Sequence, residues 1–213
     1  MGRWEPNARG RLEQAALELY VERGFEQTTV AEIAERAGLT ERTFFRHFAD
    51  KREVLFAGAG ALQELLTTAV VGAPDSVAPL EAVATALEAA GALLQERREY
   101  SRRRQAVINA NPALQERELI KLAALASALA DALRRRGVTD PAAGLTAEAG
   151  IAVFKIAFEH WISGTGEADM PQLIRESLDE LRAVTAGHVS TGGDAGYGQS
   201  QTRSSQARST AGT

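Results

Sequence analysis

Several residue types are missing or scarce in this chain of 213 residues, and each scarcity narrows what the chain can do. Cysteine is absent, which excludes disulfides, thiol nucleophiles and thiolate zinc sites and agrees with a reducing compartment. Lysine occurs three times among 24 basic residues, and the formal net charge is −4. The chain is therefore not generally polycationic, and any contact with nucleic acid must come from a local patch.

Long apolar runs are also missing. The N-terminal residues 1–7 lack the apolar stretch of a secretory signal. No window reaches about 18 uninterrupted apolar residues, the length that a membrane-spanning helix needs. A composition of 45% hydrophobic and 24% charged residues is that of an ordinary globular protein. The sequence therefore predicts a cytoplasmic chain without a membrane span.

Arrangements of catalytic residues are scarce as well. The three histidines, His47, His160 and His188, lie in separate segments, and no phosphate-binding loop, nucleophile elbow or metal-ligand spacing occurs. The carboxylates at 176–180 are interpreted as a solvated helix face. We expect no catalytic residues, no metal and no cofactor, and we do not expect an enzyme.

Apolar residues recur at helical spacing through most of the chain, and no segment alternates with period two. This pattern predicts an all-α fold of about nine helices. The first helix carries Leu12 and Leu19 and ends at Gly24, since glycine is common just past a helix. The later helices are predicted at about 79–97, 100–109, 112–136, 141–164 and 170–185.

Capping residues delimit the short helices near the N-terminus. Thr29 and Glu32 form a capping box that opens the second helix, and Thr40 can cap the third. The segment 50–53 has the pattern of a second capping box, which predicts a long fourth helix that begins there. Asn111 is the predicted cap of the helix at 112–136.

Residues 29–48 form two short predicted helices with the length of a helix-turn-helix and a glycine in the turn. At about 100° per residue, Phe44 and Phe48 share one side of the second helix. Arg42 and Arg46 lie on the opposite side. Outward arginines can read guanine in the major groove, and a threonine methyl can meet a thymine methyl. A small helical hairpin with a solvated arginine face is the alternative.

The stretch 24–55, GFEQTTVAEIAERAGLTERTFFRHFADKREVL, resembles the tetracycline-repressor (TetR) family of bacterial transcription regulators. The resemblance covers about 45 residues from Arg9, and beyond Leu55 it extends only to helix number and length. It implies a homodimer of nine-helix subunits. The first three helices would bind DNA, the fourth would lead to a ligand-binding domain, and the last two would pack against the partner subunit.

The resemblance also implies which residues meet DNA, and two of them depart from the common family pattern. Position 42 is often glycine in the family, so Arg42 can add a base contact. Position 45 is often tyrosine, so Phe45 lacks the hydroxyl that would meet a phosphate. The predicted base or phosphate contacts are Thr29, Thr40, Arg42, Thr43, Phe45, Arg46, His47 and Lys51.

Composition and the resemblance together predict four regions: an arm at 1–8, a helix-turn-helix domain at 9–52, a helical domain at 53–186, and a disordered tail at 187–213. Glycine, serine, threonine and glutamine make up 18 of the 27 tail residues, too polar a composition to fold alone. Arginines in the arm, or Arg203 and Arg208 in the tail, could help to hold DNA; disorder is the alternative.

Effector and dimer contacts are predicted for the second domain. Arginines at 97–98 and 102–104 could attract an acidic effector, or they form a charged surface corner. The resemblance implies a small, largely apolar effector bound by Leu62, Leu66, Leu87, Leu94, Ile108, Leu125, Phe154 and Phe158. The helix from Asp140 is apolar nearly all round, so one side must face a partner. The predicted interface is Val153, Ile156, His160, Ile174, Leu178 and Leu181.

These observations predict a homodimeric repressor, associated with the nucleoid, that a small-molecule effector releases from a palindromic operator. His160 could instead contact the effector. The remaining alternative is an all-α small-molecule-binding protein whose helix-turn-helix is only structural. Nothing in residues 56–165 identifies the chemical class of the effector.

Overall fold

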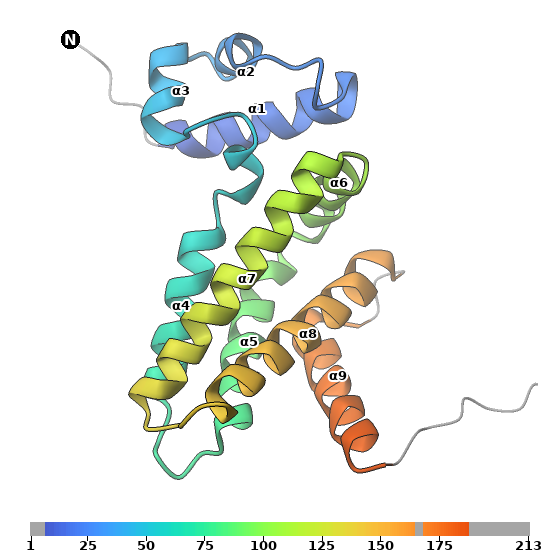
Figure 1. Ribbon diagram of the computed structural model, residues 1–213. Helices are drawn as coiled ribbons and strands as arrows, with labels where there is room; N and C mark the ends of the chain where they lie inside the picture. Colours follow the sequence, from blue (N-terminus) through green and yellow to red (C-terminus); the bar gives the residue numbers. More distant parts are fainter. Residues whose placement is uncertain (1–6, 165–167, 188–213) are drawn as a thin grey trace, which may run out of the picture.

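The computed structural model describes residues 7–164 and 168–187, and every regular element in these ranges is helical (Figure 1). The N-terminal bundle consists of α1 (Ala8–Arg23), α2 (Val30–Arg36), α3 (Glu41–His47) and the 3-10 helix η1 (Glu53–Phe56). The C-terminal bundle consists of α4 (Ala59–Gly72), α5 (Pro79–Gln95), α6 (Arg98–Asn109), α7 (Pro112–Arg135), α8 (Ala142–Ser163) and α9 (Met170–Thr185). The all-α prediction is confirmed.

Local capping shapes the N-terminal bundle as predicted. The Thr29 hydroxyl accepts from the Glu32 backbone N–H while the Glu32 carboxylate accepts from the Thr29 N–H, so the capping box is complete. Thr40 caps α3 through the N–H of Thr43. Gly24 ends α1 with φ 92°, a left-handed backbone that favours glycine. These caps hold α2 and α3 in the helix-turn-helix arrangement.

Two apolar cores organise the chain. The first joins α1, α2, α3 and η1 to the junction of α6 and α7, and Leu12, Ile33 and Phe44 are fully buried in it. The second lies among α4, α5, α7, α8 and α9 around the buried Trp161, whose indole N–H donates to Gln95. Figure 1 shows the N-terminal bundle seated on the upper ends of α6 and α7.

The predicted long fourth helix is wrong in one respect. The chain forms η1, turns through Gly58, and starts α4 only at Ala59. The Asp50 carboxylate accepts from the Glu53 N–H, but the Glu53 carboxylate pairs with Arg117 and Lys121 on α7. A capping box needs both halves, so the attraction of two cations from another helix breaks it.

The predicted cap of α7 is also wrong. The Asn111 side chain makes no cap hydrogen bond with α7. Its amide instead donates to the Val107 carbonyl near the end of α6. The asparagine therefore satisfies the preceding helix rather than the following one.

By length and composition alone, Glu53–Gly72 is apolar enough to cross a membrane. In the structure this stretch is interrupted at Gly58, and its first residue carries the ion-paired carboxylate. Leu66 and Val70 of α4 are buried in the second core. This stretch thus contributes to both cores of the folded chain.

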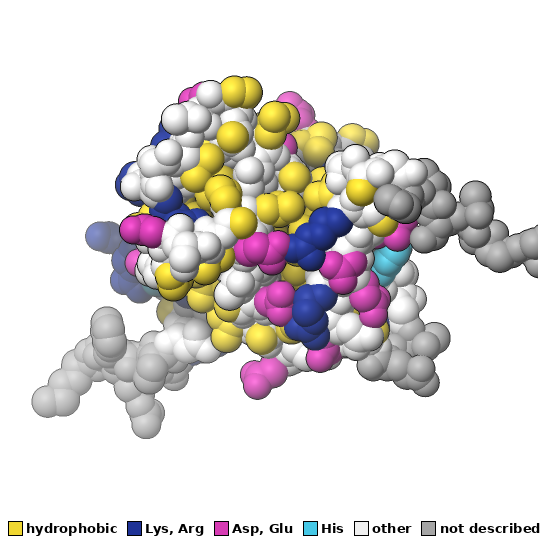
Figure 2. All heavy atoms as spheres, turned by 90° about the horizontal axis from the view of Figure 1, so that it is seen from below, with side chains coloured by type: hydrophobic (Ala, Val, Ile, Leu, Met, Phe, Trp, Pro, Cys, Tyr) yellow, Lys and Arg dark blue, Asp and Glu magenta, His cyan; other side chains and the backbone are white. Residues whose placement is uncertain are grey.

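The lower end of the molecule carries ion pairs among apolar side chains (Figure 2). Arg182 pairs with Glu81 and Asp179, and Arg134 pairs with Asp131 and Asp140. All of these side chains are substantially exposed, and exposed pairs contribute little to stability. The fold of the C-terminal bundle therefore rests on its apolar core.

The predicted arm and tail lie mostly outside the described residues. Residues 1–6 and 188–213 are not described, so their predicted flexibility and any contact of Arg203 or Arg208 stay predictions. At the inner end of the arm, Asn7 caps α1 by accepting from Gly10 N–H, and Ala8 begins the helix. These two residues belong to the folded structure, because a capped helix needs them.

Helix packing makes a prediction about two glycines of α8. A Cβ at Gly150 would lie 2.5 Å from Cγ1 of the buried Val83 on α5, whereas a Cβ at Gly144 would meet nothing within 4 Å. We expect Gly150→Ala to lower the free energy of unfolding by about 1–3 kcal/mol through overpacking. Gly144→Ala should leave it unchanged or raise it by up to about 1 kcal/mol. Urea unfolding measures both; equal stability of Gly150→Ala and wild type would contradict this packing.

Candidate DNA-binding surface and effector cavity

Helix α3 presents a charged outer face because its aromatic residues are turned inward. Phe44 is fully buried and Phe48 nearly so, and their rings lie 5.6 Å apart in the first core. Arg42 and Arg46 are exposed on the other side. Neither guanidinium forms a hydrogen bond or ion pair within the described part of the chain. Both guanidinium groups can therefore donate hydrogen bonds to base edges or phosphates.

The other described cations of the N-terminal bundle are engaged by protein groups. Arg36 forms a paired contact with Glu22, Arg23 pairs with Glu32, and Arg52 pairs with Asp50. Arg9 pairs with Glu13, and Arg11 donates to the Ala37 carbonyl. The positive charge available to a ligand is therefore concentrated on α3.

The remaining predicted DNA contacts on α2 and α3 differ in exposure. Phe45 is 55% exposed with its ring edge-on to Phe44, so it offers an apolar surface. The Thr29 and Thr40 side chains are exposed but already bond their own helix starts. His47 departs from the predicted outward face: it is half-buried, and its Nε2 is enclosed without a partner. Packing beside Phe48 turns the imidazole toward the protein.

Lys51 does not extend toward solvent as a phosphate contact would require. Its Nζ donates to the carbonyls of Phe25, Glu26 and Thr28 at 2.9, 3.1 and 3.0 Å. The ammonium also lies 4.5 Å from the Phe25 ring centroid. An ammonium has three donors, and all three are used. The predicted phosphate contact is thus replaced by a structural one that fixes the loop before α2.

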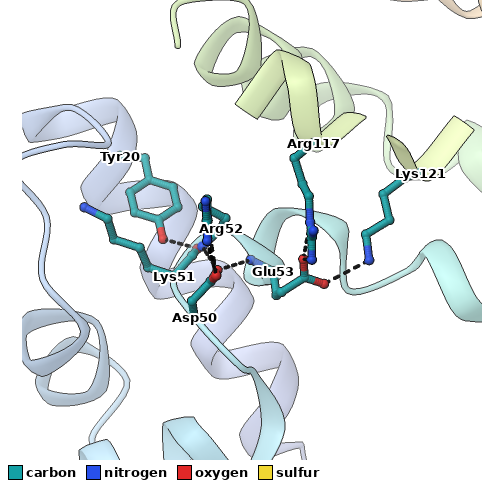
Figure 3. Close-up of polar contacts among 7 residues, drawn as sticks. All are labelled: Tyr20, Asp50, Lys51, Arg52, Glu53, Arg117 and Lys121. Carbon is teal, nitrogen blue, oxygen red and sulfur yellow. Dashed lines mark hydrogen bonds and ion pairs between the residues drawn. The ribbon is translucent and has the colours of Figure 1, made fainter. Parts of the chain in front are cut away.

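Glu53 joins the two bundles (Figure 3). Its carboxylate accepts from Arg117 Nε at 2.6 Å and from Lys121 Nζ at 3.0 Å, both on α7. Burial alone would raise the pKa of Glu53, but these two donors outweigh it and lower the pKa below its usual value. On the other side, the Tyr20 hydroxyl of α1 donates to the Lys51 carbonyl at 2.6 Å. Burial raises the pKa of Tyr20 far above its usual value, so the hydroxyl remains a donor.

Arg104 on α6 makes the second connection to η1. Its Nε donates to the Leu55 carbonyl at 2.6 Å, and its guanidinium lies 5.1 Å from the Phe56 ring centroid. The Arg104 side chain is only 19% exposed, and burial lowers its pKa. Its nearest carboxylate, Glu118, is 3.4 Å from Nη1. The buried positive charge of Arg104 is therefore only weakly balanced by a nearby carboxylate.

A cavity of about 450 Å³ opens beside this junction, among α4, α5, α6, α7 and α8. Five of the predicted effector residues line it: Leu62, Leu94, Leu125, Phe154 and Phe158. Three do not, because Leu66 and Leu87 are buried in the second core and Ile108 is buried in the first. The sequence prediction missed the polar lining, which includes Arg97, Arg104, Glu118, Lys121, Lys155 and Glu159. The arginine cluster at 97–104 was the signal that pointed to it.

The predicted dimer residues fall into two groups. Val153, Ile174 and Leu178 are 3%, 0% and 5% exposed and are packed in the second core, so they are not free for a partner. Ile156 is 49% exposed, His160 is exposed, and Leu181 is half-buried. The prediction placed the inner faces of α8 and α9 at the interface because both faces of α8 are apolar.

Comparison with known proteins identifies the family. The family model described as bacterial regulatory proteins of the tetR family matches residues 13–57, and the MftR C-terminal domain matches residues 77–186. The second match alone covers half of the chain. The chain therefore belongs to the TetR family of bacterial transcription regulators, as the resemblance implied.

Two curated relatives support this assignment. TcmR of Streptomyces glaucescens is 42% identical over 81 residues, which cover 38% of this chain and 36% of TcmR. MftR of Mycobacterium tuberculosis, a transcriptional regulator assigned to mycofactocin biosynthesis, is 26% identical over 165 residues, which cover 76% of this chain and 83% of MftR. The chain thus matches about a third of TcmR and most of MftR.

Solved structures show the same fold at low identity. The SmeT–triclosan complex is 20% identical, with a TM-score of 0.61 over 83% of this chain and 90% of SmeT. FadR of Bacillus subtilis with stearoyl-CoA is 19% identical, with a TM-score of 0.58 over 81% of this chain and 96% of FadR. These likenesses establish the fold.

The junction predicts a pH-dependent contribution to stability. Because the pKa of Glu53 is lowered in the folded state, its contribution is complete above the unfolded pKa of about 4.3 and is lost as the pH falls through the folded pKa. We expect Glu53→Gln to lower the free energy of unfolding by about 1–3 kcal/mol at pH 7 and by less near pH 3. Urea unfolding at both pH values measures this.

The control for this variant is Glu64→Gln on α4, because the Glu64 side chain is exposed and makes no ion pair among the described residues. The free energy of unfolding of Glu64→Gln should equal that of wild type at both pH values. A Glu53→Gln loss that is the same at pH 7 and pH 3 would show that the carboxylate charge does not act at this junction.

Proposed function

We propose that this chain is a sequence-specific DNA-binding repressor that acts as a homodimer on a palindromic operator and is released by a small-molecule effector. The observation that carries the proposal is the pair of exposed guanidinium groups of Arg42 and Arg46, which have no protein partner among the described residues. Arginine side chains on an exposed helix can donate two hydrogen bonds to guanine in the major groove.

A response to a small molecule is supported by the position of the cavity. Leu55 and Phe56 of η1 line the cavity and also belong to the first core. Occupants of the cavity would therefore touch the element that connects it to the DNA-binding helices. Solved neighbours of this fold are complexes with triclosan and with acyl-CoA molecules, which supports a binding role for such cavities.

Dimerisation is supported by the outer faces of α8 and α9. Leu145 and Ile156 of α8 are 68% and 49% exposed, and Val184 of α9 is 51% exposed. Ala152 lies between the first two on the same face of α8 and is also exposed. Exposed apolar side chains on two helices that pack together suit the self-complementary interface of a two-fold dimer. The half-sites of its operator would lie a whole number of turns apart, at about 34–36 Å per turn.

The recognition face predicts a specific loss of DNA affinity. We expect Arg46→Ala and Arg42→Ala each to weaken binding to DNA from upstream of the protein's own gene by about 1–3 kcal/mol and to relax specificity at one base position. The physical reason is the loss of two charge-assisted hydrogen bonds to one base. Gel shifts with wild-type and singly mutated fragments measure both effects.

The matched control is Arg135→Ala. Arg135 is also exposed and unpaired among the described residues, but it ends α7 at the far end of the molecule from α3 (Figure 1). Its loss should leave the gel shift unchanged. Wild-type affinity for both Arg42→Ala and Arg46→Ala would contradict the assignment of α3 as the recognition helix and would favour a purely structural helix-turn-helix.

The dimer assignment predicts that a charge on the outer face of α8 produces monomers. Ile156→Asp would bury an unpaired carboxylate in the interface, whereas the isolated subunit would expose it to water at little cost. Light scattering should give half the wild-type mass, with unchanged circular dichroism. Leu119→Asp is the control, since Leu119 is 61% exposed and lies on α7, outside the two helices of the proposed interface. A dimeric Ile156→Asp variant would place the interface elsewhere.

A further inference from the structure

The cavity beside η1 has two kinds of wall. Leu62, Leu125, Phe154 and Phe158 provide an apolar surface from α4, α7 and α8. Arg104 of α6 and Lys121 of α7 lie at the side next to η1. A molecule that fills this space would have an apolar body, and its polar end would face two cations.

Arg104 has unused capacity for an anion. Its Nη1 contacts with Glu118 and Gln105 are long, at 3.4 Å each, and Glu118 accepts a shorter bond of 2.9 Å from Gln105. Its Nη2 makes no hydrogen bond within the described ranges. A guanidinium in a low-dielectric setting gains strongly from a carboxylate or sulfonate that accepts two of its donors.

Lys121 can change partners at low cost. Its Nζ bonds Glu53 Oε2 at 3.0 Å, while Arg117 bonds the other oxygen of the same carboxylate. If Lys121 turned to a ligand, Glu53 would keep Arg117 and would not be left as a buried unpaired charge. The exposed lining residues Lys155 and Glu159 carry opposite charges, so they do not decide the sign of the ligand.

We propose that the effector is an apolar molecule with one anionic group, that Arg104 and Lys121 bind this group, and that their hold on η1 weakens as they do so. The proposal rests on the proposed function, because it specifies the ligand of the same cavity and how that ligand acts. The two cations now hold the Leu55 carbonyl and the Glu53 carboxylate. The ligand anion competes with Glu53 for Lys121 and draws on the guanidinium that holds Leu55, so its binding weakens the attachment of the N-terminal bundle, although Arg117 still holds Glu53.

A pair of probes that differ in one charged group tests the first step without DNA. The anionic probe is 1-anilinonaphthalene-8-sulfonate, and its neutral counterpart is N-phenyl-1-naphthylamine, which has the same rings without the sulfonate. We expect Arg104→Met and Lys121→Met each to weaken sulfonate binding by about tenfold or more, as loss of a charge-assisted hydrogen bond would. Binding of the neutral probe should change less than about twofold. Fluorescence titration measures both dissociation constants.

Two further variants separate charge from folding. Arg104→Lys keeps the charge but loses the paired donors, so it should bind the sulfonate more weakly than wild type and more tightly than Arg104→Met. Arg103→Met removes the preceding arginine of α6, which does not line the cavity, and should bind both probes as wild type does. Two outcomes would overturn the anion site. In the first, Arg104→Met and Lys121→Met lose affinity for both probes to the same extent; in the second, they lose affinity for neither probe.

The exchange of partners has its own test. Glu53→Gln removes the carboxylate that competes for Lys121, so the sulfonate should bind about three- to tenfold more tightly, while the neutral probe is unaffected. Unchanged sulfonate affinity would overturn the exchange. These titrations contain no operator DNA. A negative titration result would therefore leave the proposed DNA binding untouched, and a negative gel-shift result would not affect what the titrations show about the anion site.

Discussion

The attachment of η1 to both bundles is the constraint on which the arrangement of the molecule depends. The apolar side chains of η1 are buried in the first core, while its backbone and its one carboxylate are held by cations of α6 and α7. These contacts are charge-assisted and partly shielded from water, so each is stronger than an exposed ion pair. Moving η1 relative to the C-terminal bundle requires that these contacts weaken or break.

Lys51 extends this attachment toward the DNA-binding helices. Its backbone carbonyl accepts from Tyr20 of α1, and its ammonium holds the three carbonyls of the loop that leads into α2. The residues just before η1 therefore fix the start of the helix-turn-helix. A displacement of η1 would therefore reach the start of α2 through the backbone of residues 51–53 and the carbonyls that Lys51 holds.

The DNA-binding face follows from how charge is distributed within a nearly neutral segment. Residues 1–52 contain nine basic and nine acidic residues, so their total predicts little attraction to DNA. Ion pairs and carbonyl contacts engage most of the described cations, including Arg36 and Lys51. Arg42 and Arg46 form no ion pair within the described residues, because inward packing of Phe44 and Phe48 places the two arginines on the opposite side of α3.

Sequence alone determined the features that depend on neighbours within a turn or two of helix. The helix-turn-helix, the Thr29 and Thr40 caps and the outward arginines follow from spacings of three and four residues, and the structure contains all of them. Five of the predicted effector residues line the cavity for a similar reason, since helical periodicity places them on one side of their helices.

Only the tertiary structure decided the rest, because the partners lie far apart in the chain. Glu53 bonds residues 64 and 68 positions away, and those bonds replace the predicted capping box. Lys51 reaches carbonyls 23 to 26 positions earlier, which withdraws it from the predicted phosphate contact. Helix α8 is apolar on two sides, and packing against α5 and α9 decided which side the chain's own core covers. Periodicity defines the faces of a helix, but the partner of each face depends on how distant helices pack.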